Sequence, residues 1–180
     1  MSSLFQDLHN QLSSYPAKEP IQKQFKQQIL DYAQNEDILS SQNFTPGHIT
    51  ISALILSPDR NNVALIFHPF LKLWLQPGGH LELTDKTLLD GAKREANEEI
   101  SISLLESILP HVFDLDIHTI PENPSKKQPS HLHLDFRFLF QAKNWDIKAA
   151  SEIKEAKWVP LSEISQIKTD ASVRRLIAKL

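Results

Sequence analysis

The 180-residue chain contains no cysteine, and this absence limits its covalent and metal chemistry. Without thiols it has no disulfide bond, no thiolate metal site and no cysteine nucleophile, which fits a reducing compartment. No stretch approaches the roughly 18 apolar residues that a membrane-spanning helix needs. The first residues also lack the basic and apolar segments of an export signal. We therefore expect a cytoplasmic protein that has no membrane partner.

The sequence also lacks a strong excess of charge of either sign. Its formal net charge is −3, so it has no basic surplus with which to neutralise the phosphates of a nucleic-acid polymer. We expect no such polymer among its partners. Hydrophobic residues make up 41% of the chain and charged residues 23%, which is typical of globular proteins. A chain of this length is sufficient for one ordinary domain.

Apolar residues at helical spacing occupy the chain up to about residue 37 and predict two amphipathic helices. These helices pack on the main domain or form a homodimer contact. From residue 48 the sequence becomes rich in β-branched residues, which favours strands. We therefore expect an N-terminal helical extension over residues 1–44 and the main domain over residues 45–180.

The main domain alternates predicted strands with one central helix. Residues 48–57 and 63–68 flank a turn-like segment and predict a β-hairpin. Strands separated by one helix and closed by C-terminal helices predict an α/β fold with a mixed sheet covered on both faces. The further segments are predicted strands at 73–76, 111–120, 131–140 and 156–161, and predicted helices at 161–167 and 171–180.

Residues 131–140 alternate between apolar and polar residues, so one face of this strand is expected in the core. His131, His133 and Asp135 share the other face. This polar face either points outward, contacts substrate, or forms a separate metal site, because His-x-His at this spacing chelates metals.

Glycine is scarce, yet three of the four glycines lie between Pro77 and Ile102. Gly78 and Gly79 are adjacent at the predicted junction of a strand and a helix. Because glycine has no Cβ, the backbone there can turn sharply and approach a ligand closely. His80 follows directly and is expected near phosphate or metal.

The central helix is predicted to begin near Leu88, because Thr87 and Asp90 resemble a capping box. Glu95, Glu98 and Glu99 then fall on one arc of its surface. Carboxylates this close repel one another, so a positive partner is expected. Arg94 can offset part of the repulsion, and three carboxylates also suit a hard divalent cation, Mg²⁺ or Mn²⁺. The simpler alternative is a solvated acidic helix face.

This stretch resembles the Nudix box. Gly79 matches its opening glycine, the segment Arg94-Glu95-Ala96-Asn97-Glu98-Glu99 matches its centre, and Ile102 matches its last apolar position. Two features differ from the pattern. Asp85 stands where glutamate is usual and is separated from the arginine by eight residues instead of seven. Ser101 replaces the glycine that ends the helix in a left-handed turn, a strain of about 1 kcal/mol.

The resemblance implies a Nudix-like α/β/α sandwich that hydrolyses a diphosphate linkage in a nucleoside diphosphate derivative through metal-activated water. Its partner would be a small-molecule nucleotide substrate, and its cofactor Mg²⁺ or Mn²⁺. Glu95, Glu98 and Glu99 would bind the metal, and Glu98 or Glu99 would also help activate water. Arg94 would orient a glutamate. The substrate-binding residues would be Gly78, Gly79 and His80.

Two other functions remain open at this stage. A Nudix module can bind a nucleotide as a sensor without cleaving it, although such a module would be free to lose the glutamates. An isomerase on the same scaffold is disfavoured, because the known examples rely on a cysteine. Outside the box, the predictions are base stacking or core packing for Phe70 and Trp74, core packing for Trp158, and a surface position or additional carboxylate ligand for Glu152 and Glu155.

Overall fold

A computed structural model describes residues 2–151 and 153–180 of the chain. The chain divides into two compact units, each assembled from three segments. The first unit contains the residues up to Ile51 together with Gly79–Gly91 and His111–Arg137, and the second contains Ser52–Gly78, Ala92–Pro110 and Phe138–Leu180. None of the helices in the described part of the chain is long and apolar enough to cross a membrane.

The first unit begins with the two predicted helices, α1 (Ser3–Ser14) and α2 (Pro20–Tyr32), and this prediction is confirmed. The Ser2 side chain caps α1, while a capping box and a proline at the first turn start α2. Both helices bury their apolar faces, and α2 packs against strand β6 (Asp114–Ile120). The short helix η1 (Glu36–Leu39) follows them. The proposed boundary at residue 44 stays a prediction.

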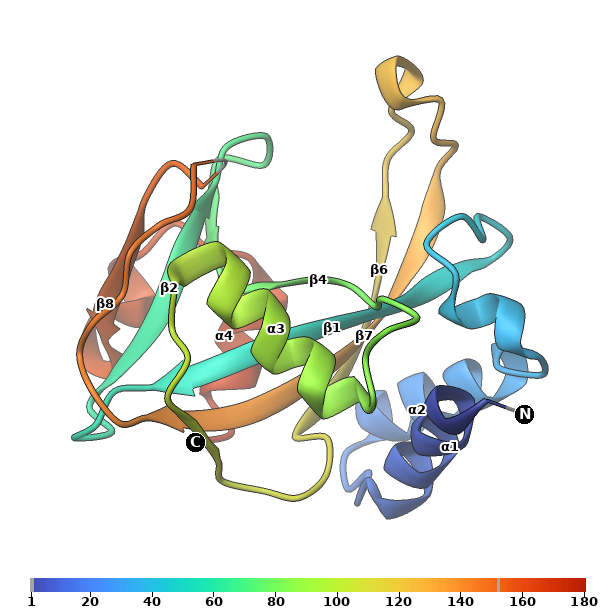
Figure 1. The fold of residues 1–180 in the computed structure, drawn as a ribbon, viewed down its shortest axis with the longest axis horizontal. Coiled ribbons are helices and arrows are strands. Elements are labelled where there is room, and N and C mark those ends of the chain that lie inside the picture. The colour runs from blue at the N-terminus through green and yellow to red at the C-terminus, as the bar shows by residue number, and fades with distance from the viewer. Residues whose placement is uncertain (1, 152) are drawn as a thin grey trace. The chain divides into compact units, whose positions relative to one another are not determined.

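Strand β6 pairs antiparallel with β7 (His131–Ala142), in a register that runs from Asp114 opposite Arg137 to Ile120 opposite His131. The two strands form a projecting ribbon with the short helix η2 (Pro124–Lys126) at its tip (Figure 1). The predicted strand at 131–140 is thus confirmed. An outward polar face is wrong, because His131, Asp135 and Arg137 are buried. Hydrogen bonds and ion pairs of these polar groups offset the cost of burying both faces of β7.

The second unit is built around β2 (Asn62–His68). The predicted hairpin is confirmed, since Leu56 at the end of β1 (Gly47–Leu56) lies opposite Val63 in an antiparallel pair. Strand β2 also pairs antiparallel with two further strands. The remaining elements are β3 (Leu73–Leu75), β5 (Leu105–Ser107), β8 (Ala156–Pro160), the 3₁₀ helix η3 (Leu161–Gln166) and helix α4 (Ala171–Ile177). Strand β5, which pairs with β7, was not predicted.

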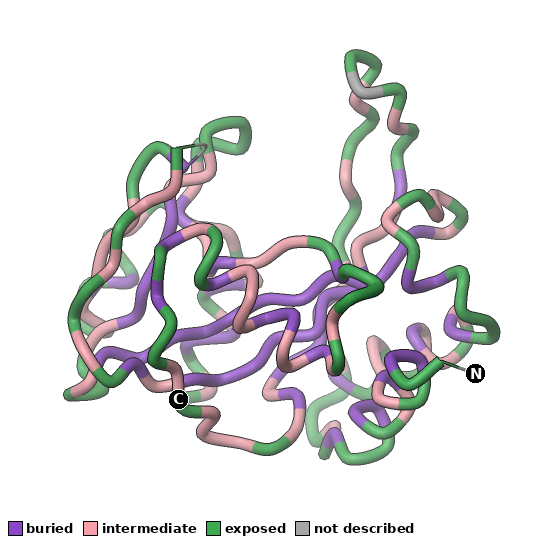
Figure 2. The backbone as a smooth tube through the Cα atoms, viewed as in Figure 1, coloured by how far each residue is buried: buried purple, intermediate pink, exposed green. Residues whose placement is uncertain are grey.

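The strands form an eight-stranded sheet whose main path is β3-β2-β1-β7-β5. The short strand β4 (Gly78–His80) pairs with β1. The part of helix α3 (Leu88–Ile100) that belongs to the second unit lies on the opposite face of the sheet from helix α4 (Figure 1). Burial follows the strands, as the purple trace in Figure 2 shows. The prediction of a mixed sheet flanked by helices is confirmed.

Candidate functional site

Helix α3 begins at Leu88, as predicted, because Thr87 caps it. The Thr87 hydroxyl accepts a hydrogen bond from the Asp90 backbone amide at 3.0 Å and donates one to the Asp90 carboxylate at 2.9 Å. The apolar side of the helix is fully buried, and this fixes the rotation of the helix about its axis. The residues that form this side are Leu88, Ala92, Ala96 and Ile100.

Arg94 connects two of the three predicted glutamates. Its Nη1 atom donates to Glu95 Oε1 at 3.0 Å and to Glu98 Oε2 at 3.2 Å. The Glu95 side chain is 13% exposed, whereas the Glu98 side chain is 51% exposed. A single guanidinium therefore reduces the repulsion between the two carboxylates and limits their rotation. Glu98 nevertheless remains accessible to solvent.

Glu99 is held by a different element. Its Oε2 atom accepts a hydrogen bond of 2.9 Å from the backbone amide of Gly78, which directly precedes Gly79 in strand β4. Glycine would permit a sharp turn here, but the pair is extended as part of β4. The extended backbone points the Gly78 amide at the helix carboxylate, while the preceding carbonyl of Pro77 accepts from Ala53 at 2.8 Å.

The two departures from the Nudix pattern have distinct local structures. Ser101 follows the helix with φ of 53° and donates its amide to the Asn97 carbonyl at 2.9 Å, so the expected left-handed helix end is confirmed. Asp85 accepts a hydrogen bond from the Glu82 amide at 2.9 Å within its own loop. It also lies so close to Gly91 that a Cβ there would come within 2.8 Å of its Oδ2 atom.

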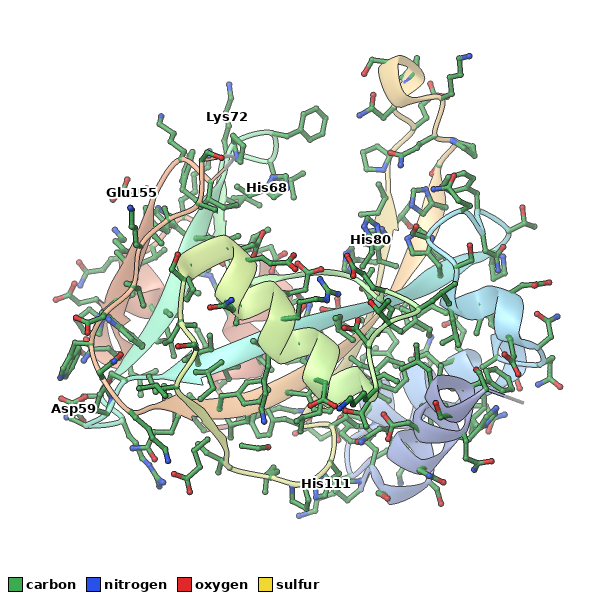
Figure 3. The ribbon with its side chains drawn as sticks, viewed as in Figure 1. Asp59, His68, Lys72, His80, His111 and Glu155 are labelled. Carbon is green, nitrogen blue, oxygen red and sulfur yellow. The ribbon has the colours of Figure 1, made fainter. Side chains whose placement is uncertain are left out.

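Three histidines from three strands converge in the first unit. They are His48 at the start of β1, His80 at the end of β4 and His133 in β7, and one ring nitrogen from each lies within 4.8 Å of the others. Their ring centroids are 4.9 to 5.5 Å apart. Figure 3 shows His80 beside the base of the β6–β7 ribbon. We call these three residues the histidine cluster.

His48 is 1% exposed, and its two ring nitrogens differ in their surroundings. Nδ1 lies 3.0 Å from the backbone carbonyl of Asn43, whereas Nε2 has no hydrogen-bond partner among the described residues. Burial, together with a smaller effect of the neighbouring imidazoles, lowers the pKa of His48 to about 4 and that of His133 to about 2. Both rings are therefore neutral at pH 7.

A buried ionic network lies in the same unit. The Arg137 guanidinium donates to Asp135 at 2.8 Å and to Asp116 at 3.0 Å, and it lies 3.8 Å from Asp114. Asp135 also accepts a hydrogen bond from Thr50 at 3.2 Å. Burial alone lowers the pKa of Arg137, but the adjacent carboxylates outweigh burial and raise it. We call these four charged residues the Arg137 network.

The histidine cluster and the Arg137 network are linked through His118. Its Nδ1 atom lies 3.0 Å from Asp116 Oδ2, and its ring centroid is 5.5 Å from that of His133. In the β6–β7 register His118 stands directly opposite His133. The sequence had singled out His80 and His133 but neither His48 nor His118. The pairing of the strands brings these histidines together, and no local sequence pattern indicates that pairing.

The other predicted residues lie in ordinary surroundings. Trp74 is buried, with the ammonium of Lys157 lying 4.2 Å from its ring centroid, whereas Phe70 is 70% exposed. The core position predicted for Trp158 is wrong, because this residue is only half-buried and its indole donates to the Trp145 carbonyl. Glu155 is exposed, and Glu152 lies outside the described residues.

The carboxylates on α3 have the donor chemistry that a hard divalent cation requires. Glu95, Glu98 and Glu99 supply carboxylate oxygens, and two of the three are already fixed in position by Arg94. The histidine cluster offers imidazole nitrogens, which suit transition metals instead. The chain thus carries two candidate sites of different donor chemistry. The first was predicted from the sequence; of the second, His80 and His133 were singled out separately, but their convergence with His48 was not predicted.

Comparison with known proteins adds independent evidence. A family model described as the NUDIX domain matches residues 46–180. A curated relative from Lactococcus lactis subsp. cremoris, named a probable DHNTP pyrophosphohydrolase, is 32% identical over 102 residues. The match covers 57% of this chain and 58% of that relative, which is less than two thirds of either protein.

Solved structures show the same fold. A NUDIX-family hydrolase from Clostridium perfringens has a TM-score of 0.54 and 22% identity, over 73% of this chain and 93% of that one. The E. coli dihydroneopterin triphosphate pyrophosphohydrolase has a TM-score of 0.54 and 17% identity over the same shares. At these identities the likeness concerns the fold.

Proposed function

We propose that this chain, which belongs to the NUDIX domain family, is a divalent-metal-dependent pyrophosphohydrolase that cleaves a diphosphate linkage in a small phosphorylated substrate. The observation that carries the proposal is the arrangement of α3, where Arg94 bonds two glutamates and the Gly78 amide bonds the third. Solvated glutamates on a helix surface would not need such fixed positions. The family match and the relative named as a pyrophosphohydrolase support this interpretation.

The residues on α3 divide into three metal ligands and one positioning residue in the proposed reaction. Glu95, Glu98 and Glu99 would hold Mg²⁺ or Mn²⁺ through their carboxylates. When bound, such an ion supplies Lewis-acid polarisation of phosphate oxygens and a water of lowered pKa. Arg94 is a positioning residue, because its guanidinium holds Glu95 and Glu98 in fixed orientations.

Proton transfer is assigned to the two glutamates nearest the end of the helix. Glu98 is exposed enough to accept a proton from a substrate-side water, whereas one Glu99 oxygen is already engaged by Gly78. Gly78 and Gly79 would present backbone to the phosphates, and no Cβ would obstruct that approach. His80 would bind substrate from the adjoining position in β4.

The substrate class is a nucleoside diphosphate derivative or a related triphosphate. Two similar proteins carry names that specify dihydroneopterin triphosphate, a pterin linked to three phosphates. This compound therefore belongs in the test panel together with nucleoside triphosphates, nucleotide sugars, dinucleotides and ADP-ribose. Dihydroneopterin triphosphate is the first substrate to try.

The test is hydrolysis of this panel by the purified full chain with Mg²⁺ or Mn²⁺, followed by ³¹P NMR of the products. We expect at least one substrate to be cleaved, and turnover to fall about 10²- to 10⁴-fold in Glu98→Gln. The matched control is Glu106→Gln, an exposed glutamate on β5 that should leave turnover unchanged. Absence of any product from the whole panel would contradict the proposal.

The sensor alternative predicts a different pattern. A non-catalytic module would bind a nucleotide without turnover, and its affinity would survive the double substitution of Glu98 and Glu99 by glutamine. Isothermal titration with the panel compounds separates the two functions. The fixed positions of the glutamates favour the enzyme, because nucleotide binding alone does not require them.

A further inference from the structure

We propose that the histidine cluster of His48, His80 and His133 is a binding site for a divalent transition-metal ion of the Zn²⁺ class. The site is separate in its residues and its chemistry from the carboxylates on α3. All three ligands belong to the first unit, whereas the three glutamates belong to the second. The inference does not depend on the proposed pyrophosphohydrolase activity.

The state of His48 is the first argument. Because the Asn43 carbonyl can only accept a hydrogen bond, Nδ1 of His48 must carry the ring proton. In the neutral ring, Nε2 then has a free lone pair. A buried acceptor without a partner destabilises the fold, and binding a metal ion at Nε2 removes this penalty.

The surroundings of the imidazoles are the second argument. Histidines that bind metals usually donate their other ring N–H to a carbonyl or a carboxylate, which fixes the orientation of the ring. His48 does so through Asn43, and the neighbouring His118 and His131 contact Asp116 and the Pro129 carbonyl in the same manner. The His48 ring is therefore oriented before any ion arrives.

The spacing of the ligand atoms is the third argument. Tetrahedral Zn²⁺ with bonds of about 2.0–2.1 Å places its nitrogens about 3.4 Å apart. The three ring nitrogens already lie within 4.8 Å of one another, so ring shifts of about 1 Å suffice. His80 is exposed and can make most of this movement. Its exposure also leaves a fourth position open to water or another donor, as in three-histidine zinc sites that bind a reactive water.

The local charge favours a cation at the same place. The Arg137 network has three carboxylates and one guanidinium, and it reaches the imidazoles through Asp116 and His118. Imidazole ligands select transition metals such as Zn²⁺, Ni²⁺ or Cu²⁺ over Mg²⁺, which prefers oxygen. The cluster should therefore not compete for the ion of the carboxylate site.

The test is titration of the chelator-treated full chain with Zn²⁺, in competition with a chromogenic chelator. We expect one equivalent to bind with a dissociation constant below about 1 μM. His48→Ala, His80→Ala and His133→Ala should each weaken binding at least about 100-fold. His9→Ala, which removes a histidine of α1 that packs on Phe5, should leave the affinity unchanged.

Further measurements keep the test decisive. His80→Ala changes an exposed side chain, so the circular dichroism of this variant without metal should match that of the unmodified chain. Zn²⁺ should raise the melting temperature of the unmodified chain but not that of His80→Ala. Co²⁺ in the site should give the visible spectrum of a tetrahedral complex. The double substitution of Glu98 and Glu99 by glutamine should retain Zn²⁺ binding while losing turnover. Zn²⁺ binding that is equal in the unmodified chain and in His80→Ala and His133→Ala, or that is lost with the glutamates, would overturn the proposal.

Discussion

The two candidate sites differ in how far apart along the sequence their residues lie. Arg94, Glu95, Glu98 and Glu99 occupy two turns of one helix, and only the Gly78 amide comes from elsewhere. The histidine cluster takes one residue from each of three strands, and it depends on the register of β6 and β7 for its neighbours. The first site is built by helical periodicity, whereas the second is built by strand pairing. We therefore expect substitutions in the first site to act locally, whereas substitutions of the buried residues around the second also disturb the fold.

The largest effect is expected at the Arg137 network. Arg137→Met leaves buried carboxylates without their cation and should lower the free energy of unfolding by about 3–5 kcal/mol. Urea denaturation followed by circular dichroism measures this loss. The control is Lys143→Met, which removes an exposed ion pair of 3.9 Å and should cost at most about 0.5 kcal/mol. Equal losses in the two variants would mean that the network does not stabilise the first unit.

Gly47 should be the next most sensitive position. It precedes His48, and a Cβ at this glycine would collide with the backbone carbonyl of Leu132. Gly47→Ala should therefore destabilise the chain by about 2–3 kcal/mol, and it should weaken Zn²⁺ binding by displacing His48. Urea denaturation and the zinc titration check the two parts. A variant as stable as the unmodified chain would show that β1 can move away from β7 without cost.

At Arg94, in the local site, we expect a large effect on turnover and a small effect on stability. Arg94→Gln removes the bonds to Glu95 and Glu98, so turnover should fall about 10- to 100-fold. Stability should change by less than about 1 kcal/mol, because the pair with Glu98 is an exposed i,i+4 contact. Steady-state kinetics on whichever substrate the panel identifies, together with urea denaturation, measure both quantities. Full activity in this variant would remove the positioning role.

The smallest effect is expected at the end of α3. Ser101 has φ of 53°, a conformation that glycine adopts without steric strain. Ser101→Gly should raise the free energy of unfolding by about 0.5–1 kcal/mol, since the relief of strain exceeds the added freedom of the unfolded chain. Chemical denaturation detects the change, and Zn²⁺ affinity should not move. A loss of stability would mean that the serine side chain makes a compensating contact.

The outcome at individual residues shows where sequence reasoning is reliable. The start of α3 at Leu88 was predicted because its cap depends on chemistry within a few residues, and the left-handed Ser101 was expected from the resemblance to the Nudix box. The glycine pair could have formed a sharp turn, but it forms β4. Its conformation is decided by pairing with β1, and pairing partners are not encoded nearby in the sequence.

The polar face of β7 shows the same limit more strongly. Alternation correctly predicted a strand, but it also suggested that the polar side faces water. Burial of Arg137 and Asp135 becomes tolerable only because Asp114 and Asp116 arrive from β6 to complete the ion pairs. No property of residues 131–140 alone predicts that those aspartates will be their partners.

The sequence by itself determined the carboxylate arc on α3 and its cap, because an α-helix places residues three and four apart on one face wherever the helix lies in the fold. The tertiary structure alone decided that His48 joins His80 and His133, and that Arg137 is enclosed by aspartates. Those groups come from strands that are distant in the chain. Only the pairing of strands in the sheet, which is set by the packing of the whole domain, brings their side chains together.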